Sequence, residues 1–600
     1  MQLMNDILPV QPRDPRPDPA PRPRGARLWG GAARRRAAAI SLAALLAVAA
    51  LAATVGTVVA SLRGVGSFGL GFPLASLTAT MSEAYGRIWG ATSSTFQLLA
   101  TGREILALLP DLARGERGPE FIALLERAES QMAALGSSRI LPSFDAKASD
   151  LARGVGSLRS WLAGAPERRI AVIFGNSAEM RAGGGFIGSF AEVTVRDGAV
   201  TGYEVRDIND ADFESGDRTV PPTQLEPVAT RWRAADANWF LSGPASGAAF
   251  LDLLNRSPLY ATQPVDAAIF VSPRLVSDLL AVTGPVKAGT LAIDASSFLR
   301  SIQEEVQEGQ ATGAEKPKAV LDTLVPAFSE QLLSSARTSP LAVLDAVQGA
   351  FLRRDIVMYA EDDGLQRVIE SLGVAGSLYP TADDFQGGYV AVAPSTIGGD
   401  KTDLVTGQAL RVSEQLLPQG LVETLVEVER THRGTETDPW WYQEEHRSYV
   451  KVYAPPGATL TGADGVWLRE RPAATYDPSF LRYPALEAIE ATVRRTDGIP
   501  GVTTFLETGK SVFGFWQRTA RGQGTVASVT YARQLKRPFV AGDTYALVLE
   551  RQPASTSSYR VELFAPPGLV WDATGTTRFL FESEDPDGRT VLPLLLRAAS

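Results

Sequence analysis

The longest apolar run of the chain lies near its beginning. Residues 37–62 contain no charged side chain over 26 positions, and no later apolar run reaches this length. About 20 residues are enough for a helix to cross a bilayer, whereas the apolar core of a signal peptide has roughly 7–15. The pattern therefore predicts one transmembrane helix at 37–62, a single-pass membrane anchor.

Apolar residues at helical spacing follow in 63–168. One stripe comprises Phe121, Leu124, Leu125, Ala128, Met132 and Leu135, and another comprises Leu151, Val155, Leu158 and Leu162. Intervals of three and four place such residues on one face of a helix. We expect an extracytoplasmic helical region here, a stalk whose stripes serve helix packing.

The pattern changes at residue 169. Ile170 to Phe174 is a continuous apolar run, typical of a strand covered on both faces. Asp197-Gly198 lies between two strand-like segments and predicts a hairpin, and Ser272-Pro273 predicts the start of a helix. Alternating strands and helices predict an α/β (α+β) core domain at 169–386, mostly helical at 293–373.

Short strand-like segments dominate residues 387–600. Examples are Val526 to Tyr531 and Tyr545 to Leu549. A strand that runs into Pro-Pro-Gly occurs twice, at 449–457 and 559–568. This region is expected to form one or two β-sandwich modules. The fold class is thus a multidomain chain with an anchor, a helical stalk, an α/β core and a β-rich C-terminal part.

Composition narrows the chemistry. The 600 residues include no cysteine and two histidines, His432 and His446. Disulfides, thiolate zinc sites and cysteine nucleophiles are excluded, and a multi-histidine metal centre is disfavoured. Carboxylates, arginines, lysines, hydroxyls and backbone amides are the groups left for chemistry.

Charge sets the expected orientation. The Pro- and Arg-rich residues 1–36 hold eight arginines against three aspartates, 8 − 3 = +5, and are expected to be disordered in the cytoplasm. The whole chain carries −9, so residues 37–600 carry −9 − 5 = −14. We expect a cell-membrane protein with a cytoplasmic N-terminus and an acidic extracytoplasmic bulk. An acidic bulk argues against nucleic acid as a partner.

A glycine-rich segment follows the first predicted strand. It carries Glu179, Arg181, Gly183, Gly184 and Gly185, which are candidate ligand-binding residues. Glycines let backbone amides approach an anion closely, and Arg181 suits a phosphate. The alternative is a tight connection in which Arg181 pairs with Glu179.

An acidic segment ends the predicted hairpin. Arg206 and Asp207 are candidate ligand-binding residues there, and Asp207 and Asp210 are candidate ligands for Mg²⁺. The alternative is a solvated loop whose aspartates cap turns. We expect Arg181, Arg206 and Asp207 to meet beside the glycines, facing a groove that admits an anion.

Several motifs carry a family resemblance. Residues 175–189 resemble the N-x-x-E-x-R-x-x-G-G-F-I-G-S hallmark of the bacterial domain-of-unknown-function family 4012. Asp236-Ala237-Asn238-Trp239 resembles its DANW, 279–286 its LL…TGPV, and 398–403 its GGNKTD, with Asp400 in place of asparagine. High Ala, Arg and Gly usage indicates an actinobacterial-type member. The resemblance supplies no activity.

The order of elements has a weaker similarity to the LytR-CpsA-Psr phosphotransferases, which attach glycopolymers to the cell wall. Val205-Arg206-Asp207 resembles the strand end of that family, and this implies roles for Arg206 and Asp207 in binding a polyprenyl pyrophosphate with Mg²⁺. Their R-S-D-T segment is replaced here by Gly-Gly-Phe-Ile-Gly-Ser, so one arginine and one metal ligand have no counterpart.

Two hypotheses for the function follow. The first is a membrane-anchored cell-envelope scaffold that binds a glycan or a lipid-linked polymer without chemistry. The second is a Mg²⁺-dependent phosphotransferase acting on polyprenyl-pyrophosphate-linked glycans. The ligand, the protein partners and the oligomeric state are left open by the sequence.

Overall fold

The computed structural model describes residues 97–599, except 99, 103, 106, 109–110, 113, 138–141, 217, 289–290, 313–318, 383, 399 and 470–473. The predicted cytoplasmic tail, 1–36, and the predicted transmembrane helix, 37–62, lie outside the described residues. Within those residues, no helix is both long and apolar enough to cross a membrane.

A five-stranded mixed sheet forms the centre of the α/β unit, in the order β3-β2-β1-β4-β7. Strand β1 pairs in parallel with β4, and the other neighbours are antiparallel. The strands are β1 (Arg168–Arg181), β2 (Gly184–Arg196), β3 (Ala199–Asp207), β4 (Ala267–Val271) and β7 (Ile356–Ala360). The apolar run at 170–174 is confirmed as strand, and Ile173 is fully buried in it. Strand β7 lies inside the segment expected to be mostly helical.

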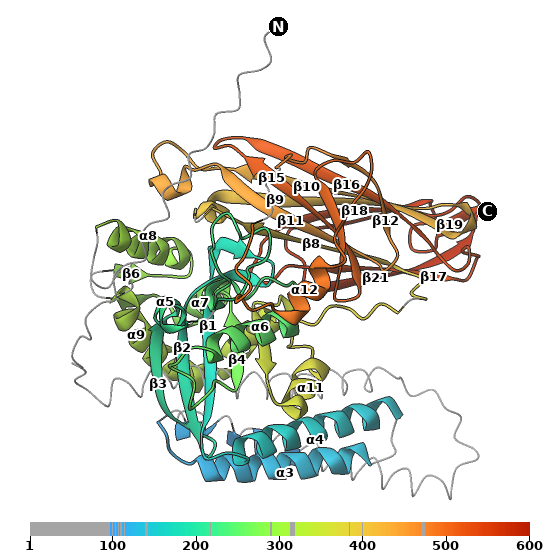
Figure 1. Cartoon of the computed structure of the whole chain (residues 1–600). Coiled ribbons are helices and arrows are strands. Elements are labelled where there is room, and N and C mark those ends of the chain that lie inside the picture. Colours follow the sequence, from blue (N-terminus) through green and yellow to red (C-terminus); the bar gives the residue numbers. More distant parts are fainter. Residues whose placement is uncertain are drawn as a thin grey trace, which may run out of the picture.

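Both ends of β2 turn tightly. Asp197 and Gly198 adopt φ of 48° and 78°, which confirms the hairpin predicted from Asp-Gly. At the other end, the expected glycine-rich turn is shorter than predicted, because Ala182 and Gly183 make the turn and Gly184 already belongs to β2. Strand β1 pairs with β4 as far as Phe174 and then continues for seven more residues. The tip of the β1–β2 hairpin therefore extends toward the C-terminal strands (Figure 1).

Helices cover both faces of this sheet. The described helices of the unit are α3 (Gly118–Gly136), α4 (Pro142–Ala163), α5 (Ile208–Glu214), η1 (Ala234–Asp236), α6 (Gly243–Asn255), α7 (Pro273–Thr283), α8 (Phe298–Ala311), α9 (Ala319–Thr338), α10 (Pro340–Leu352) and α11 (Asp363–Ser371). Helix α6 and residues 225–241 pack on one face, and α3, α4, α7 and α9–α11 pack on the other. A small hairpin, β5 (Val286–Ala288) and β6 (Leu291–Ile293), follows α7.

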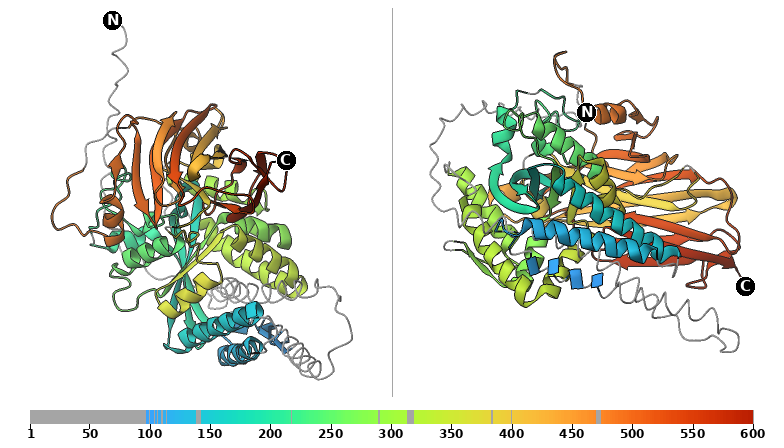
Figure 2. Two further views of the ribbon diagram at one scale, coloured as in Figure 1. Left: turned by 90° about the vertical axis from the view of Figure 1, so that its right-hand side faces the viewer. Right: turned by 90° about the horizontal axis from the view of Figure 1, so that it is seen from below.

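The helices expected as a separate stalk are part of this layer. Phe121 of α3 and Trp161 of α4 belong to the same buried cluster as Ile170 and Val195 of the sheet. The left view of Figure 2 shows α3 and α4 at the end of the α/β unit that lies away from the C-terminal strands. Their apolar stripes therefore serve packing, as predicted, but against the sheet as well as against each other.

The C-terminal strands form one β-sandwich. Its six-stranded sheet has the order β12-β16-β10-β9-β18-β20, and its eight-stranded sheet the order β13-β14-β15-β11-β8-β17-β21-β19. The elements are β8 (Gly388–Thr396), η2 (Thr402–Val405), β9 (Thr406–Leu416), η3 (Pro418–Gly420), β10 (Leu421–His432), η4 (Trp440–Tyr442), β11 (His446–Ala454), β12 (Thr459–Asp464), α12 (Pro484–Glu490), β13 (Arg494–Arg495), β14 (Val502–Glu507), β15 (Lys510–Thr519), β16 (Gly524–Gln534), β17 (Thr544–Glu550), β18 (Ser558–Phe564), β19 (Leu569–Trp571), β20 (Arg578–Ser583) and β21 (Arg589–Ala598). Inward-facing residues of both sheets share one core. The two Pro-Pro-Gly segments follow β11 and β18, in different sheets.

Candidate functional site

The tip of the β1–β2 hairpin carries a buried arginine, Arg181, of which 3% is exposed. Its Nε donates to Asp236 Oδ1 at 2.9 Å, its Nη2 to Glu179 Oε1 at 3.0 Å, and its Nη1 to the Thr396 carbonyl at 2.7 Å. Both carboxylates are buried as well. Each of the three guanidinium nitrogens of Arg181 is therefore already bonded to a group of the protein.

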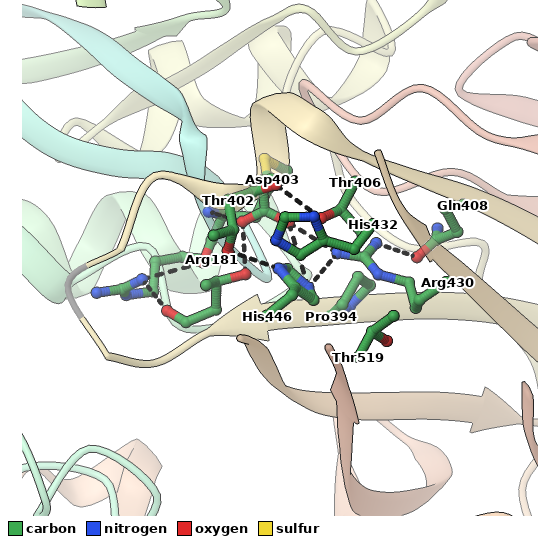
Figure 3. A network of polar contacts seen from close by, with 12 residues as sticks. Arg181, Pro394, Thr402, Asp403, Thr406, Gln408, Arg430, His432, His446 and Thr519 are labelled. Atoms are coloured by element: carbon green, nitrogen blue, oxygen red, sulfur yellow. Dashed lines mark hydrogen bonds and ion pairs between the residues drawn. The ribbon is translucent and has the colours of Figure 1, made fainter. Parts of the chain in front are cut away.

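The network continues into the sandwich through Asp403 of η2 (Figure 3). Asp403 accepts from the Met180 backbone N–H at 2.8 Å and pairs with Arg430 at 2.7 Å. Arg430 Nη2 lies 2.6 Å from His446 Nε2, and His446 Nδ1 lies 2.9 Å from Thr402 Oγ1. Because a guanidinium only donates, Nε2 is the acceptor and the ring proton belongs on Nδ1. Burial and the Arg430 charge lower the pKa of His446 to about 3, so the ring is neutral.

Charges in this network are balanced. Burial alone would raise the pKa of Glu179, but Lys401 and Arg181 beside it hold that pKa below its usual range. Gln552 adds neutral bonds from the sandwich, donating to the carbonyl oxygens of Arg181 and Pro394 at 2.7 Å each. The family motifs around Glu179, Asp236 and Lys401 thus meet where the α/β unit contacts the sandwich. We call this buried network the lock; it comprises Glu179, Arg181, Asp236, Lys401, Asp403, Arg430 and His446. Of the two interpretations of Arg181, pairing with Glu179 is the one found.

The glycines at the hairpin tip serve close packing. A Cβ on Gly185 would lie 2.3–2.5 Å from backbone atoms of Asn176, and Gly184 has φ of +124°. The Gly183 N–H donates to the Asn238 carbonyl at 2.8 Å. Side chains are excluded here by the neighbouring backbone. The Gly183 amide, which could have faced an anion, is already bonded within the protein.

Arg206 lies elsewhere, on β3. It pairs with Glu192 and Glu204 at 2.8 Å each and is partly exposed. Arg206 is opposite Phe190 on β2, six positions from Gly184, the β2 partner of Arg181. At about 3.3 Å per residue, six positions span roughly 20 Å. The expected meeting of Arg181, Arg206 and Asp207 beside the glycines is wrong, because Arg181 sits at the far tip of a long hairpin.

The two aspartates of the acidic segment start helix α5. Asp207 is its N-cap and accepts from the Asn209 backbone N–H at 3.0 Å, and Asp210 is exposed in the first turn. This matches the interpretation of turn-capping aspartates. Across the described part of the chain, no three His, Asp or Glu side chains lie close enough together to hold a metal ion. A Mg²⁺ site at Asp207 and Asp210 stays a prediction.

An apolar cavity of about 310 Å³ lies between the sheet and helices α7, α8 and α9. Strand residues on its wall are Phe174, Ala191, Val193, Tyr203, Val205 and Val271. Helix residues on its wall include Leu275, Val276, Leu279, Phe298, Ile302, Val306, Leu324, Val325 and Phe328. Val205 lines the cavity and Arg206 follows it in the strand, so Arg206 faces the opposite side of the sheet.

Polar residues gather at one end of this cavity. Asn176, Ser189 and Asn209 lie at the same end of the sheet, where β1, β2 and the start of α5 are neighbours, and Lys401 reaches the wall from the sandwich. A second apolar cavity of about 170 Å³ lies on the same sheet face, beneath α3 and α4. The sequence did not single out either cavity, because wall residues have the same apolar spacing as solid core.

Comparison with known proteins gives a family and little else. No curated protein matches the chain in sequence. Among solved structures, the Lin1025 protein from Listeria innocua is 9% identical, with 36% of this chain and 81% of that chain covered and a TM-score of 0.18. The transcriptional regulator yvhJ from Bacillus subtilis is 12% identical, with coverages of 35% and 97% and a TM-score of 0.16.

Residues 166–306 match the family model described as "Protein of unknown function (DUF4012)". This segment runs from β1 to α8 and contains Glu179, Arg181 and Asp236 of the lock together with most of the wall of the larger cavity. The resemblance to family 4012 read from the sequence motifs is therefore confirmed over residues 166–306, the segment that matches the DUF4012 model.

Proposed function

We propose that this chain is a membrane-anchored, extracytoplasmic cell-envelope protein that binds the apolar chain of a lipid-linked polymer. The observation that carries the proposal is the apolar cavity of about 310 Å³ under α7, α8 and α9. Small-molecule sites occupy roughly 300–1,000 Å³, and an engineered cavity of about 150 Å³ already admits benzene. The cavity is large enough for a segment of an aliphatic or isoprenoid chain.

Side chains of the sheet and of three helices together form the wall of the cavity, so a ligand can bind there only when these elements are folded together. A ligand that binds the folded chain in this way stabilises it through linkage.

The chemistry of the wall favours an aliphatic occupant. Val276, Ile302 and Phe328 are representative of its helical side, and Lys401 is the single charged residue on the wall among those the structure describes. Lys401 pairs with Glu179. The phosphotransferase hypothesis needs Arg181 and Arg206 at one phosphate, and no observation favours it over binding, since Arg181 is enclosed in the lock and Arg206 lies on the other sheet face.

Mass spectrometry of the full chain, purified in mild detergent, tests the proposal. A co-purifying lipid is expected from the wild type. Val276→Trp fills the larger cavity from α7 and should lower the bound lipid at least tenfold. Val155→Trp makes the same change in the second cavity and is the matched control. Equal lipid in the wild type and Val276→Trp would refute the proposal.

The membrane part of the proposal rests on the uncharged segment 37–62 and the +5 tail before it. A reporter that is active only in the cytoplasm, fused after Ser600, should be silent in cells. The same reporter fused before residue 37 should be active and serves as the control. An active C-terminal fusion would overturn the orientation.

A further inference from the structure

Helix α8 presents a row of carboxamides along the cavity wall. Gln303, Gln307 and Gln310 follow one another at intervals of four and three, so they share one side of the helix, next to the apolar pair Ile302 and Val306. Exposure rises along the row, because Gln303 is buried, Gln307 is half-buried and Gln310 is exposed. The row therefore leads from inside the cavity to the surface.

Gln303 is the unusual member of the row. It is 6% exposed, and its carboxamide has no hydrogen-bond partner within the part of the chain that the structure describes. Gln307 instead donates to Gln310 at 3.0 Å. Ser329 of the neighbouring helix α9 also lines the cavity, is 1% exposed and has no partner among the described residues. Neither the Gln303 carboxamide nor the Ser329 hydroxyl is among the enclosed unpartnered atoms of the described residues, so both are accessible from the cavity and can bond to a polar group that enters it.

The cations near this cavity already have carboxylate partners. Lys401 pairs with Glu179, and Arg300, one turn before Gln303 on α8, pairs with Glu304 and Asp438. A phosphate would bring a net negative charge, and among the described residues of the wall there is no uncompensated cation to meet it. A carboxamide, in contrast, both donates and accepts, which matches a hydroxyl group.

We propose that Gln303 recognises the ligand by hydrogen bonding an uncharged, hydroxyl-bearing head group, with Gln307 and Gln310 continuing the contact toward solvent. The inference rests on the proposed function, since it assigns the head group of the chain that the cavity holds. The ligand class is a long-chain alcohol or its neutral glycoside, and the phosphate ester of the same chain is disfavoured.

Binding of four probes to the full chain in amphipol tests the inference: dodecanol, dodecyl glucoside, dodecyl phosphate and dodecane. Wild type should bind an uncharged hydroxyl-bearing probe about five- to tenfold more tightly than dodecane, the effect of one neutral hydrogen bond. Gln303→Leu should abolish that preference and leave dodecane binding unchanged. Glu305→Leu, on the exposed side of α8, is the matched control and should behave as wild type.

The outcomes separate the two proposals. If no probe binds, the proposed function fails. If all four bind alike, or if Gln303→Leu keeps the wild-type preference, the cavity binds chains but the inference about Gln303 is overturned. Tighter binding of dodecyl phosphate also overturns it. Comparing dodecanol with dodecyl glucoside tells a free alcohol from a glycoside.

Melting of Gln303→Leu without ligand tests whether Gln303 has a structural role instead. An unchanged or higher melting temperature supports the inference. A large drop in melting temperature, together with an equal loss of binding for all four probes, overturns it.

Discussion

The hairpin-tip lock and the apolar cavity lie next to each other and differ in how their polar groups are satisfied. In the lock, Arg181 and Glu179 are almost fully buried and each is bonded to an opposite charge. In the cavity, Gln303 is equally buried and lacks a partner among the described residues. The recognisable sequence motifs lie in the lock, whereas the candidate ligand site lies beside a helix, α8, that carries no motif. In this chain the motifs therefore mark the contact between the α/β unit and the sandwich, not the candidate ligand site.

The sharpest test of the lock is removal of its central cation. Arg181→Ala leaves Glu179 and Asp236 buried with one partner fewer, which should lower the free energy of unfolding by about 3–5 kcal/mol. Arg206→Ala is the matched control. Its ion pairs are partly exposed, and Glu192 keeps its pair with Arg169, so about 1 kcal/mol or less is expected. Urea unfolding of both variants measures the difference. Equal losses would mean that Arg181 does not hold the units together.

A second test separates a packing glycine from an anion-binding one. Gly185→Ala should cost about 1–3 kcal/mol, because the added Cβ meets backbone atoms of Asn176 that cannot move aside. Gly202→Ala is the control, since no atom lies within 4 Å of its Cβ. Thermal melting of the two variants without added ligand gives the comparison. A stable Gly185→Ala protein would contradict the packing role.

Local signals predicted the α/β unit well. The apolar run Ile170 to Phe174, the Asp197-Gly198 turn and the Ser272 cap all appear as expected, because each depends on neighbouring residues only. The short strand β7 was missed, since five residues between helices carry little periodicity.

The candidate site was predicted less well, for reasons of distance along the chain. Lys401, the partner of Glu179, and Asp403, which accepts from the Met180 N–H, lie more than 200 residues after those partners, so no local pattern shows these contacts. The length of the β1–β2 hairpin, which carries Arg181 away from Arg206, follows from pairing that extends past β4. An apolar wall is likewise indistinguishable from core until the helices are placed around it.

The lock also makes stability depend on pH through His446. The folded-state pKa of about 3 lies below the ordinary value of 6.5, so the unfolded chain binds the proton first. The contribution is therefore present above pH 6.5 and is lost as pH falls toward 3, with a slope near 1 kcal/mol per pH unit. Asp212 and Asp400, whose pKa values burial raises to about 6, act in the opposite direction between about pH 4 and 6.

His446→Gln isolates this effect, because the two aspartates titrate alike in both proteins. Free energies of unfolding measured from pH 7 to pH 4.5 should fall less steeply in His446→Gln than in wild type. Parallel curves would show that His446 is accessible to protons in the folded state.

The smallest expected effect concerns the acidic segment, where the structure assigns Asp207 to a helix end. Asp207→Ala removes the N-cap that accepts from the Asn209 N–H and should cost about 1 kcal/mol, with or without Mg²⁺. Asp210→Ala, at the exposed position in the same turn, should change stability by about 0.5 kcal/mol or less.

Melting both variants and the wild type in EDTA and in millimolar Mg²⁺ decides whether Asp207 is a helix cap or a metal ligand. A cap makes the Asp207→Ala loss independent of Mg²⁺. If Mg²⁺ stabilises the wild type and either substitution removes that gain, the acidic segment binds the metal, and the anion site expected beside the glycines would have to be sought at the start of α5 instead.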